Sequence, residues 1–188
     1  EICACLVGSE MCIRDSFRAY NNLGELAFAA GDAAKAESYF KQAASKNANA
    51  PEVNANLGLC ELVKGNVAAA ESYLGKATGA NAANEALGNL YIKQGQYDRA
   101  VNAFGDAKTN SAAQAQILAK DYNKAKATLS AIKNPDAMTD YLMAIVGART
   151  NNASLVSSSI KSAIAKDASM AQRAANDREF AKFADSIK

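Results

Sequence analysis

The chain has 188 residues, with 21 Lys and Arg against 19 Asp and Glu and a formal net charge of +2 at pH 7. It contains no His, which removes Ser–His and Cys–His catalytic pairs and His-based metal motifs. Its basic residues are dispersed, which disfavours nucleic-acid binding, and no apolar run approaches the roughly 18 residues of a membrane span. We therefore expect no catalytic residue, metal, cofactor, nucleic-acid partner or transmembrane segment.

The first sixteen residues, EICACLVGSEMCIRDS, match nothing that follows them. They lack the basic start and long apolar run of a signal peptide, and CLVGSEMCIRDS resembles a translated sequencing-adapter read-through. We expect residues 1–16 to be a non-native leader that is disordered or irregular. Without this segment only Cys60 remains, and one thiol makes neither a disulfide nor a metal site. Because the chain starts at Glu1 rather than Met, we expect a fragment of a longer protein.

A pattern of small and large residues recurs three times along the chain. Each copy has Leu-Gly, a second Gly seven residues on, an Ala five residues later and a bulky apolar residue four residues after that. The three-to-four spacing on both sides of the second Gly predicts two helices joined by a turn at that Gly. The signature residues are Leu23, Gly24, Gly31, Ala36 and Phe40, then Leu57, Gly58, Gly65 and Ala70, then Leu87, Gly88, Tyr91, Gly95, Ala100 and Phe104.

The third copy, ALGNLYIKQGQYDRA, resembles the tetratricopeptide repeat family, whose hairpins carry Leu-Gly-x-x-Tyr, Gly-x-Tyr and Ala at matching offsets. Three consecutive copies make the resemblance specific. It implies an all-α, right-handed α-solenoid of about five helical hairpins with a C-terminal capping helix or helix pair. We expect the solenoid over residues 17–165, with hairpins at about 17–50, 51–80, 81–110, 111–135 and 136–165, and the cap over 166–188.

In this family the first helix of each hairpin lines a concave groove, so the resemblance also implies positions that face a partner. These positions are Asn21, Glu25, Phe28, Ala55, Leu59, Leu62, Val63, Glu85, Asn89, Ile92, Lys93 and Ile117, with Gln114, Leu118, Tyr141, Ile145 and Arg149 added by weaker alignment. Four of them, Phe28, Leu62, Ile92 and Ile117, are expected to form an apolar row along the groove. Family members that bind chaperones use a basic, Asn-rich clamp for a terminal carboxylate. The matching positions here hold Asn21, Glu25 and Asn56, and Glu25 would repel a carboxylate.

The resemblance implies a non-enzymatic interaction scaffold that takes up a peptide or a helix of a protein partner in its groove. The alternative is a structural spacer of a larger envelope protein, whose groove is filled by the same polypeptide, including domains upstream of this segment. Stretches such as NAPEVNANLGL resemble bacterial members associated with the cell envelope. This similarity implies the periplasmic side of the envelope, with the cytoplasm as the alternative location.

Overall fold

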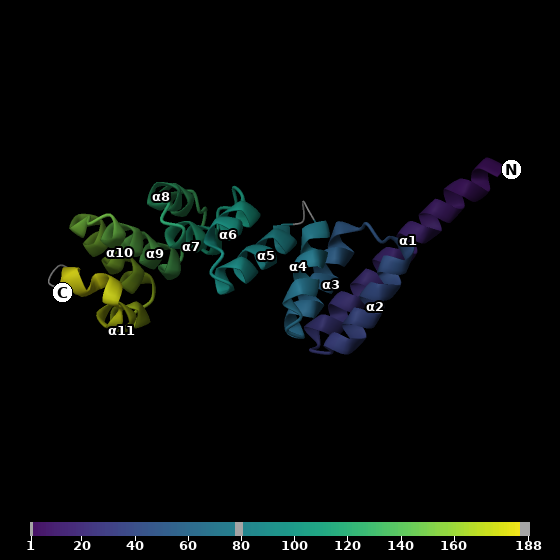
Figure 1. Ribbon diagram of the computed structural model, residues 1–188, viewed down its shortest axis with the longest axis horizontal. Helices are drawn as coiled ribbons and strands as arrows, with labels where there is room; N and C mark the ends of the chain where they lie inside the picture. Colours follow the sequence, from purple (N-terminus) through teal and green to yellow (C-terminus); the bar gives the residue numbers. More distant parts are fainter. Residues whose placement is uncertain (1, 78–80, 185–188) are drawn as a thin grey trace. The chain divides into compact units, whose positions relative to one another are not determined.

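The computed structural model describes the backbone of residues 2–77 and 81–184 and the side chains of residues 16–77 and 81–184. Within these ranges the regular elements are all helical (Figure 1). The expected all-α fold of consecutive helical hairpins is confirmed. The five hairpins pair α1 (Ile2–Ala29) with α2 (Ala33–Lys46), α3 (Pro51–Val63) with α4 (Val67–Lys76), α5 (Asn81–Lys93) with α6 (Tyr97–Phe104), α7 (Asn110–Leu118) with α8 (Tyr122–Ser130), and α9 (Ala137–Arg149) with α10 (Ala153–Lys166). They are followed by α11 (Ser169–Asn176) and the 3₁₀ helix η1 (Arg178–Phe183).

The first helix is longer than the repeat pattern predicts. Residues 1–16 were expected to be irregular, but the backbone is helical from Ile2 onward and continues without a break into the first hairpin. No proline occurs between Ile2 and Ala29, so nothing interrupts the ladder of backbone hydrogen bonds once the helix has formed. The side chains of residues 1–15 lie outside the described part of the chain.

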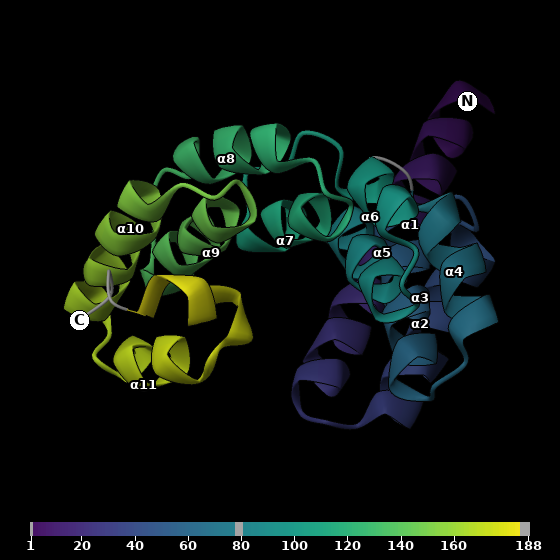
Figure 2. The same cartoon turned by 60° about the vertical axis from the view of Figure 1, so that its left-hand side comes forward.

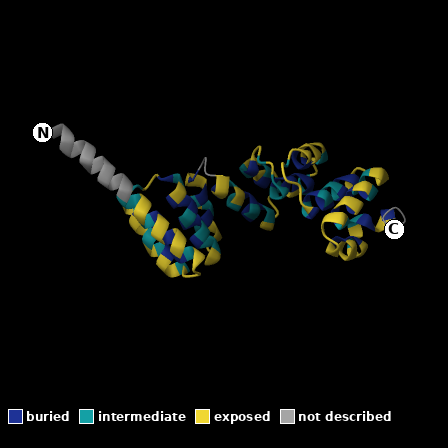
Figure 3. Cartoon of the chain, turned by 180° about the vertical axis from the view of Figure 1, so that it is seen from behind, coloured by how far each residue is buried: buried dark blue, intermediate teal, exposed yellow. Residues whose placement is uncertain are grey.

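The chain divides into two compact units, Glu1–Leu87 and Gly88–Lys188, and the boundary falls within α5. Figure 3 shows that buried residues lie where consecutive helices face each other within each unit. In the first unit, one core joins α1, α2 and α3 through a set that includes Phe40, Val53 and Leu57. In the second unit, one core joins α7, α8 and α9, and another joins α9 and α10 to the C-terminal elements.

All five hairpins turn on the same backbone geometry, although only three of them use glycine. The turn residues have positive φ, as in Gly31 with φ 82°, and the N–H of the next residue donates to the carbonyl five positions earlier. The same geometry is adopted by Gly65 and Gly95, and then by Lys120 with φ 64° and Asn151 with φ 54°. This bond pattern satisfies carbonyls at the helix end, so the turn persists where the glycine signal is lost.

The glycine of each Leu-Gly pair lies where the two helices of its hairpin cross. A Cβ atom on Gly58 would lie 2.6 Å from Leu74 Cγ, and one on Gly88 would lie 2.5 Å from Phe104 Cε2. A Cβ on Gly24 would likewise overlap the ring of Phe40. Because Phe40, Leu74 and Phe104 are buried, they have little room to move away.

Substituting alanine for glycine is therefore expected to have opposite effects at two sites in the second hairpin. Gly58→Ala should lower the free energy of unfolding by about 1–3 kcal/mol, because the new methyl group overpacks the crossing. Gly75→Ala, in α4, should raise it by about 0.5–1 kcal/mol, because no atom lies within 4 Å of the added Cβ and alanine favours the helix. Urea unfolding followed by circular dichroism measures both changes. A gain in stability for both variants would contradict the close crossing.

The C-terminal elements pack against the last hairpin, with α11 on α10 and η1 on both α9 and α10 (Figure 2). The rings of Tyr141 and Phe180 meet edge to face with centroids 5.5 Å apart. The Tyr141 hydroxyl donates a hydrogen bond of 2.6 Å to Asp177 Oδ2, and Arg149 pairs with Glu179. Burial and the neighbouring Asp177 raise the pKa of Tyr141, so its hydroxyl remains a donor at neutral pH.

Candidate functional site

Three polar side chains on the first helices of the first two hairpins form a hydrogen-bonded group. On α1, Asn21 Nδ2 donates to Glu25 Oε1 at 2.7 Å, one helical turn away. From α3, Asn56 Nδ2 donates to Asn21 Oδ1 at 3.0 Å and to Glu25 Oε1 at 3.2 Å. These are the three residues that the sequence places at the clamp positions of the chaperone-binding proteins. The structure brings them together across two hairpins.

A pocket of about 200 Å³ lies beside this polar group, within the first unit. Its apolar lining comes from Phe28 and Ala29 on α1, Phe40 on α2 and Leu59 on α3. Phe40 is buried, whereas Phe28 and Leu59 are half-buried and expose part of their surface. Glu25 and Asn56 complete the lining. The site is thus a small apolar hollow with a fixed carboxylate and a fixed amide at its edge.

Glu25 differs from Glu37 and Glu61 of the same unit in the charge of its hydrogen-bond partners. Glu37 bonds to both Lys41 and Lys64 at 2.6 Å, and Glu61 bonds to Lys64 at 2.9 Å. Hydrogen bonds to these lysines hold the pKa values of Glu37 and Glu61 below their ordinary range. Glu25 is bonded only by neutral amides, and no Lys or Arg among the described residues forms an ion pair with it. Its charge is therefore available to a ligand.

The remaining predicted groove positions on α3 and α5 differ in how far they are exposed. On α3, Ala55 is buried, Leu62 is half-buried and Val63 is 63% exposed. On α5, Glu85 and Lys93 are exposed, and Asn89 and Ile92 are half-buried.

Two predicted groove positions of the second unit are buried: Ile117, the last member of the expected apolar row, and Tyr141. Ile117 is buried in the core that α7 forms with α8 and α9, and Tyr141 is buried against Phe180. The predicted groove positions fall in both units, and the candidate site comprises positions of the first unit alone.

Two residues that line this pocket, Ala29 and Phe40, were not predicted as site residues from the sequence. Ala29 follows Glu25 by one helical turn, so the helical period could have placed both on one face. Phe40 was predicted only as a residue of the repeat signature, but it also lines the pocket. Cys60, also on α3, is fully buried, and burial raises the pKa of its thiol. Its place in the hydrophobic core fits a structural side chain.

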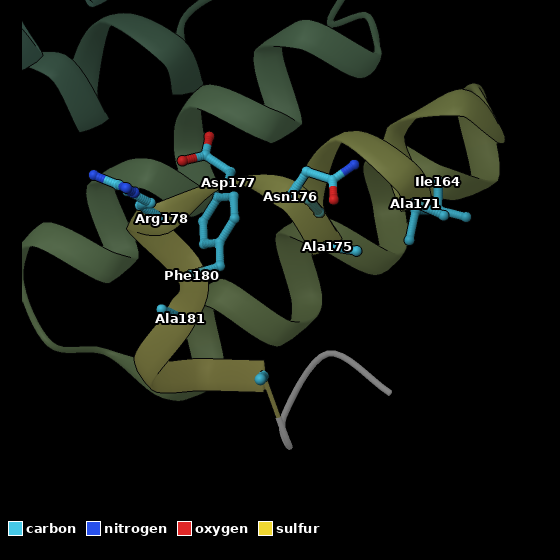
Figure 4. A pocket seen from close by; sticks show the side chains of 10 residues that line it. Ile164, Ala171, Ala175, Asn176, Asp177, Arg178, Phe180 and Ala181 are labelled. Atoms are coloured by element: carbon cyan, nitrogen blue, oxygen red, sulfur yellow. The ribbon is translucent and has the colours of Figure 1, made fainter.

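A second pocket, of about 470 Å³, lies among α10, α11 and η1 (Figure 4). Its lining is mainly alanine with Ile164 and Phe180, and it ends at Ala184, the last described residue. For that reason no site is built on it.

Membrane-spanning helices and metal sites are both absent from the described ranges. Within residues 2–77 and 81–184, no helix is long and apolar enough to cross a membrane. The described side chains also include no group of three Cys, Asp or Glu residues arranged to hold a metal ion.

Comparison with known proteins identifies the repeats. Two tetratricopeptide repeat family models match residues 27–91 and residues 82–112. No curated protein sequence gives a significant match.

Several solved structures share the fold at low sequence identity. A tetratricopeptide repeat protein from Parabacteroides merdae superposes with a TM-score of 0.71 at 17% identity, over 92% of this chain and 77% of that one. PilW, described as a type IV pilus biogenesis factor, gives 0.64 at 20% identity, over 93% and 89% of the two chains. YrrB, described as having an unusual peptide-binding site, gives 0.63 at 18% identity, over 82% and 89%.

Proposed function

Because this chain belongs to the tetratricopeptide repeat family, we propose that it is a non-enzymatic interaction scaffold whose α1–α3 face binds a peptide or a helix of a protein partner. The observation that carries the proposal is the pocket beside the Asn21–Glu25–Asn56 group. Asn56 reaches across from α3 to α1, so the polar edge is held in place before a ligand arrives. A site organised in advance loses less conformational freedom on binding.

The dimensions of the pocket favour a peptide over a small molecule. At about 200 Å³ it lies below the roughly 300–1,000 Å³ of sites that enclose a drug-sized ligand. A hollow of this size suits a single anchoring side chain, with the rest of the partner lying over the half-buried surfaces of Phe28 and Leu59. YrrB supports this proposal only as an example of the same fold that has a peptide-binding site.

Selection from a library of random twelve-residue peptides tests the proposal. Ala29→Phe should fill the pocket and weaken binding of the selected peptides by at least about tenfold, because Ala29 lines the hollow. Ala34→Phe is the matched control, since Ala34 is equally an exposed helical alanine but lies on α2 outside the lining. Fluorescence anisotropy measures affinity, and circular dichroism checks the fold of both variants.

Two results would overturn the proposal. Selected peptides that bind both variants as tightly as the wild type would show that the pocket is not the binding site. Failure to select any peptide above background would favour the alternative, a spacer whose groove is not open to a separate partner.

We also propose that the chain acts in the bacterial cell envelope. The support is the resemblance of its sequence texture to envelope-associated members and the description of PilW, which shares the fold, as a type IV pilus biogenesis factor. Fractionation of cells that express the full-length protein, with detection in the periplasmic or membrane fraction, is the expected result. Recovery in the cytoplasm alone would refute this location.

A further inference from the structure

We propose that the partner places a cationic side chain, Lys or Arg, in the α1–α3 pocket and pairs its charge with Glu25. This inference rests on the proposed function and adds the chemistry of the ligand. It starts from the uncompensated charge of Glu25, which is bonded only by the amides of Asn21 and Asn56. A partner that brings a positive charge supplies the ion pair that the described residues do not.

The hydrogen-bond geometry leaves room for this pairing. Both hydrogen bonds to Glu25 end on Oε1, and Oε2 accepts no hydrogen bond from the described residues. A carboxylate accepts about four hydrogen bonds in all, so a guanidinium or ammonium group still finds acceptors. The two amides hold Oε1, which leaves Oε2 for a charge-assisted contact with the ligand.

The pocket walls suit the rest of such a side chain. Lys and Arg have aliphatic stems that pack on apolar surfaces while their charged ends reach a polar edge. Phe28, Ala29 and Leu59 provide the apolar surface, and Glu25 provides the polar edge of the same hollow.

An anionic ligand fits this site poorly. The amides of Asn21 and Asn56, which would otherwise hold a carboxylate, already donate to Glu25. Asn56 uses both of its N–H groups in these bonds and Asn21 uses one of its two, so a second carboxylate would approach a negative charge with a single amide N–H left to bind it. At the positions where a carboxylate clamp presents donors to a negative ligand, this site presents a carboxylate that can accept from a positive one.

The test uses the peptides selected on the wild-type chain. We expect Lys or Arg at one position in most of them. In the peptides that carry Arg, we expect citrulline at that position to weaken binding by about tenfold or more. Citrulline keeps the shape of Arg and removes its charge, so the loss measures the charge-assisted contact. Glu25→Gln, which keeps an oxygen for the two amides, should cause a similar loss and remove the preference for the cation. Glu52→Gln, at an exposed acid of α3, is the control and should change binding less than twofold.

The outcomes separate this inference from the function on which it rests. The inference alone would be refuted by the following result. Ala29→Phe weakens peptide binding, which shows that the peptides bind at the pocket, but the peptides show no cation preference and bind Glu25→Gln as tightly as the wild type. Peptides that bind equally well to Ala29→Phe would refute the proposed site, and the inference with it. An equal response to Glu25→Gln and Glu52→Gln would show a general charge effect and would also refute the inference.

Discussion

Aspartate in place of Leu57 is expected to lower the free energy of unfolding by more than about 3 kcal/mol, whereas aspartate in place of Leu23 should lower it by less than about 1 kcal/mol. The two leucines occupy the same position of the repeat, 34 residues apart. Leu57 is 3% exposed in the core between α2 and α3, but Leu23 is 43% exposed on α1. A carboxylate at Leu57 would be buried without a partner, and one at Leu23 would remain hydrated.

The low helix propensity of aspartate lowers the stability of both variants to a similar extent, because both substitutions fall within helices. The difference between the two variants therefore reports on burial. Urea unfolding of the two variants gives the difference. If Leu23→Asp proves as damaging as Leu57→Asp, then another element covers α1 in solution. The sequence pattern alone assigned the two leucines the same role, and the structure corrects that for Leu23.

Alanine in place of Phe180 is expected to remove about 3–5 kcal/mol of stability from the C-terminal part of the second unit. Phe180 is 2% exposed and packs edge to face on Tyr141 of α9. Its loss leaves a cavity and weakens the attachment of η1. Tyr141→Phe should cost less, about 1–3 kcal/mol, because it keeps the ring but leaves Asp177 Oδ2 without its donor.

Hydrogen exchange is the appropriate measurement, because repeat proteins lose structure locally and not in one step. Faster exchange should be confined to α9, α10, α11 and η1 in both variants, and exchange in α1–α4 should not change. Lys182→Ala, at an exposed position of η1, is the control. Unchanged exchange in α9 and α10 after Phe180→Ala would show that η1 does not stabilise the last hairpin.

The first three hairpins could be predicted from the sequence because their glycines mark two backbone requirements at once. Gly58 permits a close helix crossing, and Gly65 adopts the left-handed turn. In the fourth and fifth hairpins Lys120 and Asn151 take the same turn, so composition no longer marks it. There the capping residues that follow, Asp121 and Asn152, carry the remaining signal, since each accepts a bond from the backbone N–H three positions later.

The candidate site could be predicted only in part. Family positions indicated Asn21, Glu25 and Asn56, but not that the amides would bond to the carboxylate. The pocket was not predicted, because its walls come from three helices and depend on how far each side chain is covered by its neighbours. Ile117 shows the same limit, since the repeat register places it in the groove row but the packing around α7 buries it.

The most direct test of the proposed binding site is an NMR titration of the ¹⁵N-labelled chain with a selected peptide. The side-chain amide signals of Asn21 and Asn56 report on the polar edge of the pocket, and backbone signals report on each helix. We expect the largest shifts at these two amides and at residues near Phe28 and Leu59, and we expect these shifts to be lost in Ala29→Phe. Shifts confined to α2, α4 or the second unit, with both amides unmoved, would contradict the proposed binding site.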